Sequence, residues 1–130
     1  MTYAESIEYM NDLLKFGIRP QLDRISALSG AFGNPHKQLK VIHVAGTNGK
    51  GSTSTFIASI LREAGYRVGL YLSPYVHDIR ERIQIDGNMI SKDDFAAIIT
   101  EIKPAAEKIA ATELGPVTEF EVKTMAAYLY

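Results

Sequence analysis

A short apolar run stops in a glycine-rich turn, and a helical pattern follows at once. Residues 39–45 are typical of a buried strand, and the turn after them reads Gly-Thr-Asn-Gly-Lys-Gly-Ser. Apolar residues then recur at helical spacing from residue 52 to residue 64, and Gly65 ends the pattern. A strand, a glycine turn and a helix in this order restrict the chain to folds that combine helices with a sheet.

A second apolar run, residues 67–72, follows the helix. Strand, helix and strand in close succession predict a βαβ unit, which favours a parallel sheet with a right-handed crossover. We therefore predict an α/β fold in which helices flank a parallel sheet. A parallel sheet is buried on both faces, and a unit with only two strands and one helix cannot cover both faces of its own sheet. The chain is thus expected to be the front part of a larger domain.

The remaining pattern is mostly helical, with one hairpin. Asp86-Gly87 between apolar residues predicts a hairpin turn. Ser91 with Asp94 three residues on resembles a capping box with Asp in place of Glu. Pro104 is expected to kink or interrupt the helix that follows. Helical spacing is seen at residues 3–16, 21–32, 95–109 and 122–129.

Composition excludes several classes of protein. A hydrophobic content of 46% with 22% charged residues fits a globular chain, not a disordered one. The net charge of -1 indicates no bulk attraction to nucleic acid or to an anionic membrane. The absence of cysteine excludes disulfides and thiolate metal sites. It also suits a reducing compartment, and we expect the protein to be cytoplasmic. No apolar stretch is long enough to span a bilayer, and the N-terminus does not resemble a signal peptide.

The glycine turn has every part of a phosphate-binding loop. Its glycines leave backbone N–H groups free to point inward, Lys50 can reach terminal phosphates, and Ser52 or Thr53 can offer a hydroxyl to Mg²⁺. The spacing is unusual, since Val44 stands where the first glycine belongs and Gly51 separates the lysine from the serine. The alternative is a plain glycine-rich turn with a solvent-facing lysine. The flanking strand and helix favour phosphate binding, which makes the predicted sheet P-loop-type.

Residues 45–53 resemble the nucleotide loop of the Mur ligase superfamily, which is shifted in the same way. More narrowly they resemble folylpolyglutamate and dihydrofolate synthases, as do the segments LDRISALSGAFGNPHKQLK, GLYLSPYVHDIRERIQIDG and VTEFEVKTMAAYLY. The short lead before the loop favours this folate branch over cell-wall ligases, which carry a whole domain there. The resemblance implies that residues 1–130 are the N-terminal part of a Mur ligase-like ATP-binding domain. It implies nucleotide contacts by Gly46, Thr47, Asn48, Gly49, Lys50, Gly51, Ser52 and Thr53.

The family resemblance also implies a reaction. ATP phosphorylates a carboxylate of folate or dihydropteroate, and the amine of L-glutamate attacks the acyl phosphate. Lys50 would be catalytic, since it would balance the β and γ phosphates. Ser52 and Ser73 would ligate Mg²⁺, with ATP and Mg²⁺ as cofactors. For Ser73 the alternative is a serine that caps a turn before Pro74.

Two segments match the family's contacts with the acceptor. Phe120 could stack on a flat pterin ring, with ordinary core packing as the alternative. The segment Leu22-Asp23-Arg24 could equally be a solvated helix end. The residues concerned are Leu22, Asp23 and Arg24 in the first segment, and Thr118, Glu119, Phe120 and Glu121 in the second.

Arg80 and Arg82 follow Ser73 in a charged segment. They could meet phosphate or substrate carboxylates through paired hydrogen bonds, and Arg82 is the candidate substrate-binding residue. A solvated run of charges at Asp78, Arg80, Glu81 and Arg82 is the interpretation that we favour for this segment.

Other family residues needed for turnover lie outside the sequence, so we expect a chain that binds phosphate but is inactive alone. The parent is expected to be a monomer with no nucleic-acid or membrane partner. The rival interpretations are a non-catalytic nucleotide-binding module, a cell-wall precursor ligase, and a structural α/β fragment without ligands. The motifs leave open whether pteroate or folate is the acceptor.

Overall fold

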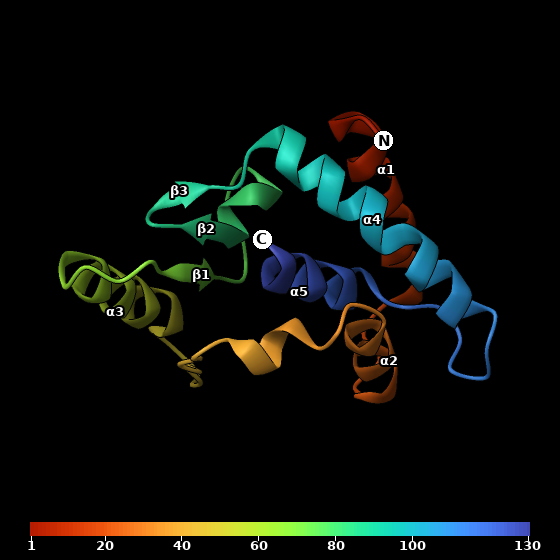
Figure 1. The fold of residues 1–130 in the computed structure, drawn as a ribbon, viewed down its shortest axis with the longest axis horizontal. Helices are drawn as coiled ribbons and strands as arrows, with labels where there is room; N and C mark the ends of the chain where they lie inside the picture. Colours follow the sequence, from red (N-terminus) through yellow and green to blue (C-terminus); the bar gives the residue numbers. More distant parts are fainter. The chain divides into compact units, whose positions relative to one another are not determined.

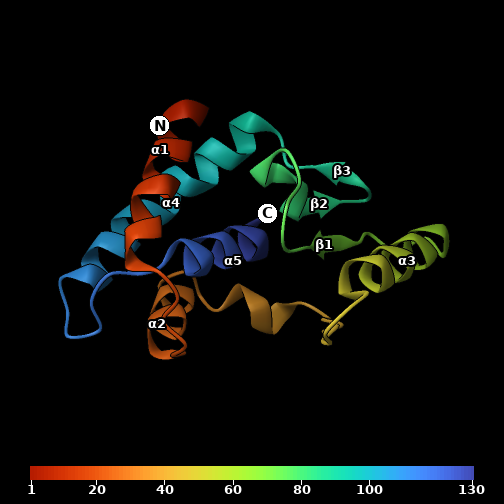
Figure 2. The same cartoon turned by 180° about the vertical axis from the view of Figure 1, so that it is seen from behind.

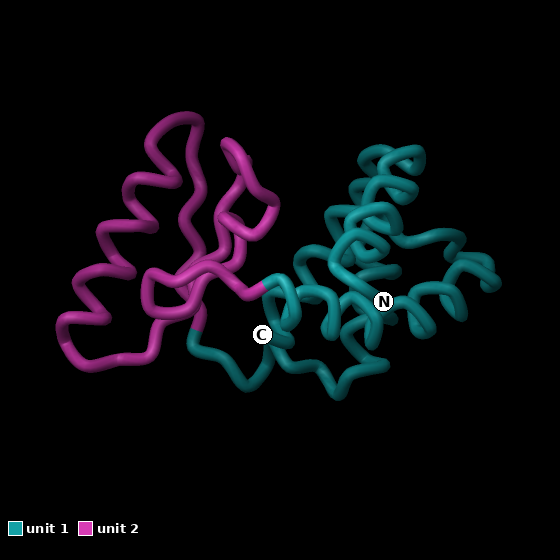
Figure 3. Tube along the Cα trace, turned by 90° about the horizontal axis from the view of Figure 1, so that it is seen from above, with its two compact units in different colours: residues 1–40, 92–130 teal, residues 41–91 magenta.

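The computed structural model describes residues 1–130 and divides them into two compact units. Met1–Lys40 and Lys92–Tyr130 form a helical unit, and Val41–Ser91 form a mixed unit of helix and sheet (Figure 3). The mixed unit is therefore inserted, in sequence, between the two halves of the helical unit.

The helical unit is built around one long helix. Its elements are α1 (Tyr3–Leu13), η1 (Leu14–Phe16), α2 (Asp23–Ala31), η2 (Pro35–Gln38), α4 (Lys92–Ala110) and α5 (Glu119–Leu129). Helix α4 contacts α1, α2 and α5, and Figures 1 and 2 show it beside α1. The helices predicted from apolar spacing are confirmed, with boundaries that differ by a few residues.

The apolar face of α4 supplies the centre of this unit's core. Phe95, Ile99 and Ile102 are fully buried, and their spacing of three or four residues places them on one face of the helix. The Phe95 ring packs edge-on against Tyr3, with 5.8 Å between ring centroids. The other helices contribute buried residues of their own: Met10, Leu28, Val122 and Met125.

Helix α4 continues through Pro104, so the predicted interruption is wrong. A proline removes one backbone N–H from the helix and crowds the preceding turn. Ile102 and Ala106 on either side of it are buried. We infer that burial of this face outweighs the lost hydrogen bond.

The mixed unit has one helix and a small sheet. It contains α3 (Lys50–Glu63), β1 (Gly69–Tyr71), η3 (Ile79–Arg82), β2 (Ile83–Ile85) and β3 (Asn88–Met89), with the strands in the order β1-β2-β3. Asp86 and Gly87 connect β2 to β3 with φ angles of 51° and 82°. These positive angles are those of a tight hairpin turn, so the Asp-Gly hairpin is confirmed.

The strand pairing differs from the prediction. β1 pairs antiparallel with β2, with Gly69 opposite Ile85 and Tyr71 opposite Ile83. Residues 39–45 form no strand, because a strand requires hydrogen-bonded neighbours and no segment of the chain pairs with them. The parallel βαβ pairing is therefore not formed within these residues.

The predicted core stripe of α3 is exposed. Phe56 and Ile60 are each 68% exposed, and Val41 and Ile42 in the unpaired segment are 63% and 61% exposed. No helix of the structure is long and apolar enough to cross a membrane.

Phe95→Ala should destabilise the helical unit by about 3–5 kcal/mol, because it empties a fully buried ring site. The free energy of unfolding, measured in urea, checks this value. Phe56→Ala is the matched control, since the same truncation at an exposed site should change stability by less than about 0.5 kcal/mol. Equal losses in the two variants would contradict the assignment of the core.

Candidate nucleotide and acceptor sites

The glycine turn brings the predicted nucleotide residues together at the start of α3. Gly49 is the N-cap, in the left-handed region with φ 74° and ψ 5°, and Gly46 has φ 153°. A side chain at either position would be strained, so the glycines permit the turn. Helix α3 begins at Lys50 and not at Ser52 as predicted, which places Ser52 and Thr53 in its first turn.

The N-terminus of α3 is open to an anion. Its cap, Gly49, offers no side-chain hydrogen bond, and the first turn contains no acidic residue. The N–H of Thr53 donates to the carbonyl of Gly49 at 2.9 Å, so the preceding N–H groups lie before the first helical bond. These free donors and the helix dipole favour negative charge here.

Lys50 lies folded back across the turn. Its Nζ donates to the carbonyl oxygen of Gly46 at 2.6 Å, and no carboxylate neutralises it. All of residues 45–53 are exposed. The ammonium group is therefore accessible and has a carbonyl, not an acid, as its neighbour.

Ser73 lies just after β1, before a cis peptide bond to Pro74. Arg82, the last residue of η3 and directly before β2, donates from Nη1 to the Ser73 hydroxyl at 3.3 Å. The adjoining strand pairing places them together, since the N–H of Leu72 donates to the carbonyl of Arg82 at 2.9 Å. The Ser73 hydroxyl thus faces a guanidinium group.

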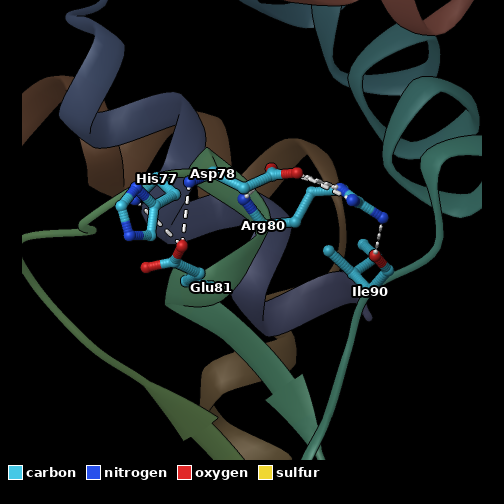
Figure 4. A network of polar contacts seen from close by, with 5 residues as sticks. All are labelled: His77, Asp78, Arg80, Glu81 and Ile90. Carbon is cyan, nitrogen blue, oxygen red and sulfur yellow. Dashed lines mark hydrogen bonds and ion pairs between the residues drawn. The ribbon is translucent and has the colours of Figure 1, made fainter.

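The charged segment after Ser73 is not a solvated run, so the interpretation favoured from sequence is wrong. Arg80 binds Asp78 through two nitrogens, with Nε at 3.0 Å and Nη2 at 2.7 Å from Oδ2 (Figure 4). Its Nη1 also donates to the carbonyl of Ile90 at 3.4 Å. Arg82 is only 9% exposed. These charges hold the loop, which the sequence alone does not reveal.

Glu81 anchors the same loop. Its carboxylate accepts hydrogen bonds from the backbone N–H groups of His77 at 3.0 Å and Asp78 at 2.9 Å (Figure 4), and from that of Val76 at 2.8 Å. These hydrogen bonds, that from Val76 first, lower the pKa of the Glu81 carboxyl below its ordinary 4.5. The spacing of Asp78 and Glu81 is that of a capping box, a signal that could have been read from the sequence.

The loop at residues 76–78 should loosen when Glu81 is protonated. Because the folded-state pKa is lowered, this stabilisation is fully present above the ordinary pKa of 4.5 and is lost as pH falls through the lowered value. Amide hydrogen exchange of Val76, His77 and Asp78, corrected for intrinsic rates, should show protection falling below about pH 4.5. Glu81→Gln should have a flatter profile, and identical profiles in both proteins would refute the role.

The two segments predicted to contact the acceptor, residues 22–24 and 118–121, lie together in the helical unit. Arg24 of α2 donates from Nε to Oε2 of Glu121 at 3.2 Å, and both side chains are buried. Glu121 also accepts from the N–H of Thr118 at 2.7 Å in a capping box at the start of α5. Arg24 is further held by the carbonyl of Arg19 at 3.0 Å and by Gln21 at 3.3 Å. The solvated alternative is therefore wrong for Arg24.

The neighbours of these paired residues are exposed. Phe120 is 55% exposed and Leu22 is 76% exposed, so Phe120 is not a core residue as its alternative supposed. Asp23 is exposed, and Glu119 forms an ion pair with Lys123 along α5. The structure thus separates the two segments into paired, buried residues and exposed apolar ones.

Removing only one partner of the Arg24–Glu121 pair should lower the stability of the fold. Arg24→Met should destabilise by about 3–5 kcal/mol, because it leaves a buried carboxylate without its cation. Arg24→Met with Glu121→Leu should recover most of this loss, apart from about 1 kcal/mol for the lost cap. Urea unfolding of the three proteins measures both effects. A double variant less stable than the single one would contradict this account.

Comparisons with known proteins agree with the motifs. No family model matches the chain. The dihydrofolate synthase/folylpolyglutamate synthase of Bacillus subtilis (strain 168) is 44% identical over 128 residues, 98% of this chain and 30% of that protein. The folylpolyglutamate synthetase from Lactobacillus casei gives a TM-score of 0.91 at 37% identity, over 100% of this chain and 33% of that one. An FPGS complex with AMPPCP and folate gives 0.87 at 36% identity, over 100% and 32%.

These structures confirm the predicted α/β class, and the fold that they share with this chain is of the Mur ligase type. The chain belongs to the folylpolyglutamate synthase and dihydrofolate synthase family. It spans between 30% and 33% of the relatives described above. The resemblance drawn from the motifs is thus confirmed over the whole chain, and a position at the N-terminal end of such a protein fits this share.

Proposed function

We propose that the complete protein is an ATP-dependent ligase that adds L-glutamate to folate, to dihydropteroate, or to both. This chain would supply its phosphate loop and part of the acceptor site. The observation that carries the proposal is the open N-terminus of α3, where glycines and an unneutralised Lys50 surround a site suited to phosphate. The FPGS complex with AMPPCP and folate supports the two ligand classes.

Residues 46–53 would cradle the phosphates. Lys50 would leave the Gly46 carbonyl and bind the β and γ phosphates, whose charge it would balance as transfer proceeds. Mg²⁺ takes oxygen ligands and needs only one or two from protein, and the exposed hydroxyls of Ser52 and Ser73 fit that requirement. When bound, it would neutralise phosphate charge.

The reaction has two steps in this proposal. A carboxylate oxygen of the acceptor attacks the γ-phosphorus of ATP, and ADP leaves with the bond electrons. The uncharged amine of glutamate, which has lost its proton, then attacks the acyl carbon and expels phosphate to form the amide. Both steps bring anions together, so cations and exclusion of water are needed.

The acceptor would lie against the exposed residues of the helical unit. Phe120 offers a ring for stacking on a pterin, and Leu22 offers a second apolar surface. Arg24 and Glu121 would hold α2 and the start of α5 in place, since they are buried and bonded to each other. Thr118 would act through its cap. The exposed Asp23 is a candidate for a polar contact, and so is Glu119, which is partly buried and paired with Lys123.

Calorimetric titration of Mg-ATP tests the loop, both in this chain and in the longer protein. Lys50→Ala should weaken binding by about tenfold or more, because a charge-assisted hydrogen bond contributes about 1.5–3 kcal/mol. Lys37→Ala is the control, since Lys37 is exposed and lies outside the loop. Unchanged affinity in Lys50→Ala would refute phosphate binding by the loop.

Turnover in the longer protein distinguishes a ligase from a simple nucleotide-binding module. Release of phosphate that depends on both glutamate and a folate acceptor supports the ligase. Tight Mg-ATP binding with no such release would support the module instead.

A further inference from the structure

Arg82 is a buried cation without an anion. Its side chain is 9% exposed, it forms no ion pair, and its Nε is buried with no hydrogen-bond partner. Its single hydrogen bond runs from Nη1 to the Ser73 hydroxyl, which is neutral. A guanidinium group has five N–H donors, so most of its capacity is unused.

The other arginines in comparable positions are compensated. Arg24 is buried with Glu121 at 3.2 Å, and Arg80, two residues before Arg82, is bonded to Asp78. Arginine cannot lose its proton to relieve the cost of burial. A buried charge without a partner is strongly unfavourable. The cost at Arg82 points to an anion that arrives from outside the chain.

The surroundings of Arg82 are ordered and reachable. Pairing of β1 with β2 sets Ser73 beside it, and Glu81 holds residues 76–78 through three backbone hydrogen bonds. The Tyr75 ring lies over the guanidinium, 5.0 Å from its centroid to Cζ. Ser73 and Tyr75 are both exposed, so a ligand can approach from their side.

We propose that Arg82 binds the carboxylate of the acceptor that receives glutamate. The inference rests on the proposed function and names one chemical group within it. A planar carboxylate matches the Nε and Nη2 edge of a guanidinium in a paired hydrogen bond. The nucleotide phosphates have their own donors at the start of α3, so a second anion is the one that lacks a binding group. Binding here would hold the carboxylate and offset its charge.

Steady-state ligation by the complete protein tests this role. Arg82→Gln should raise KM for the folate acceptor by about 10- to 100-fold, the loss expected for charge-assisted hydrogen bonds, and leave KM for ATP within about twofold. Arg82→Lys should have a KM for the acceptor between those of wild type and Arg82→Gln, since lysine keeps the charge but loses the paired hydrogen-bond geometry. Arg67→Gln is the matched control, because it removes the same charge from an exposed side chain of the mixed unit and should leave KM for the acceptor unchanged.

A measurement independent of turnover uses thermal stabilisation of the complete protein by folate and by its γ-methyl ester. Wild type should be stabilised more by folate than by the ester, and Arg82→Gln should not distinguish them. Without ligand, Arg82→Gln should melt at or above the wild-type temperature, since it removes an uncompensated buried charge.

Three outcomes would overturn the inference. They are an acceptor KM unchanged in Arg82→Gln, a rise confined to KM for ATP, and equal stabilisation of wild type by folate and by the ester. A wild-type protein that binds folate in preference to the ester but forms no amide would instead overturn the proposed function and leave the carboxylate site standing.

Discussion

The buried pair between Arg24 and Glu121 joins the two ends of the helical unit. The two residues lie 97 positions apart in sequence, yet the guanidinium of one pairs with the carboxylate of the other at 3.2 Å. Glu121 also closes the cap with Thr118, so one carboxylate holds α2 and starts α5. The exposed Phe120 next to it is thereby placed on an ordered helix end. The acceptor surface that we propose depends on this pair.

Charge compensation separates the cations that hold segments together from those that we propose bind ligands. Arg24 and Arg80 each have a carboxylate partner, and their role is to hold segments together. Lys50 and Arg82 have only neutral oxygen partners, a carbonyl and a hydroxyl. The proposed ligation brings phosphate and a carboxylate together, and two cations that no internal acid has neutralised would offset their charges. The mixed unit contains both.

Local signals predicted much of the fold and of the site. The glycine turn, the Asp-Gly hairpin and the helices follow from spacing and turn chemistry, which act within a few residues. The pairing of β1 with β2 could not be read in the same way, because an apolar run does not specify its neighbour. The burial of Arg82 was also missed, since a charged segment in sequence is typical of a solvated surface.

By itself, the sequence determined the glycine turn and the helix that follows it. Gly46 and Gly49 adopt angles that side chains disfavour, and the helix dipole follows from the pattern after them. The tertiary structure alone decided which charges are neutralised, because partners such as Arg24 and Glu121 are set by packing and not by spacing. It also decided that Arg82 lies buried beside Ser73, since that contact depends on strand register. The phosphate site that we propose depends on local chemistry, whereas the second anion site that we propose requires the folded chain.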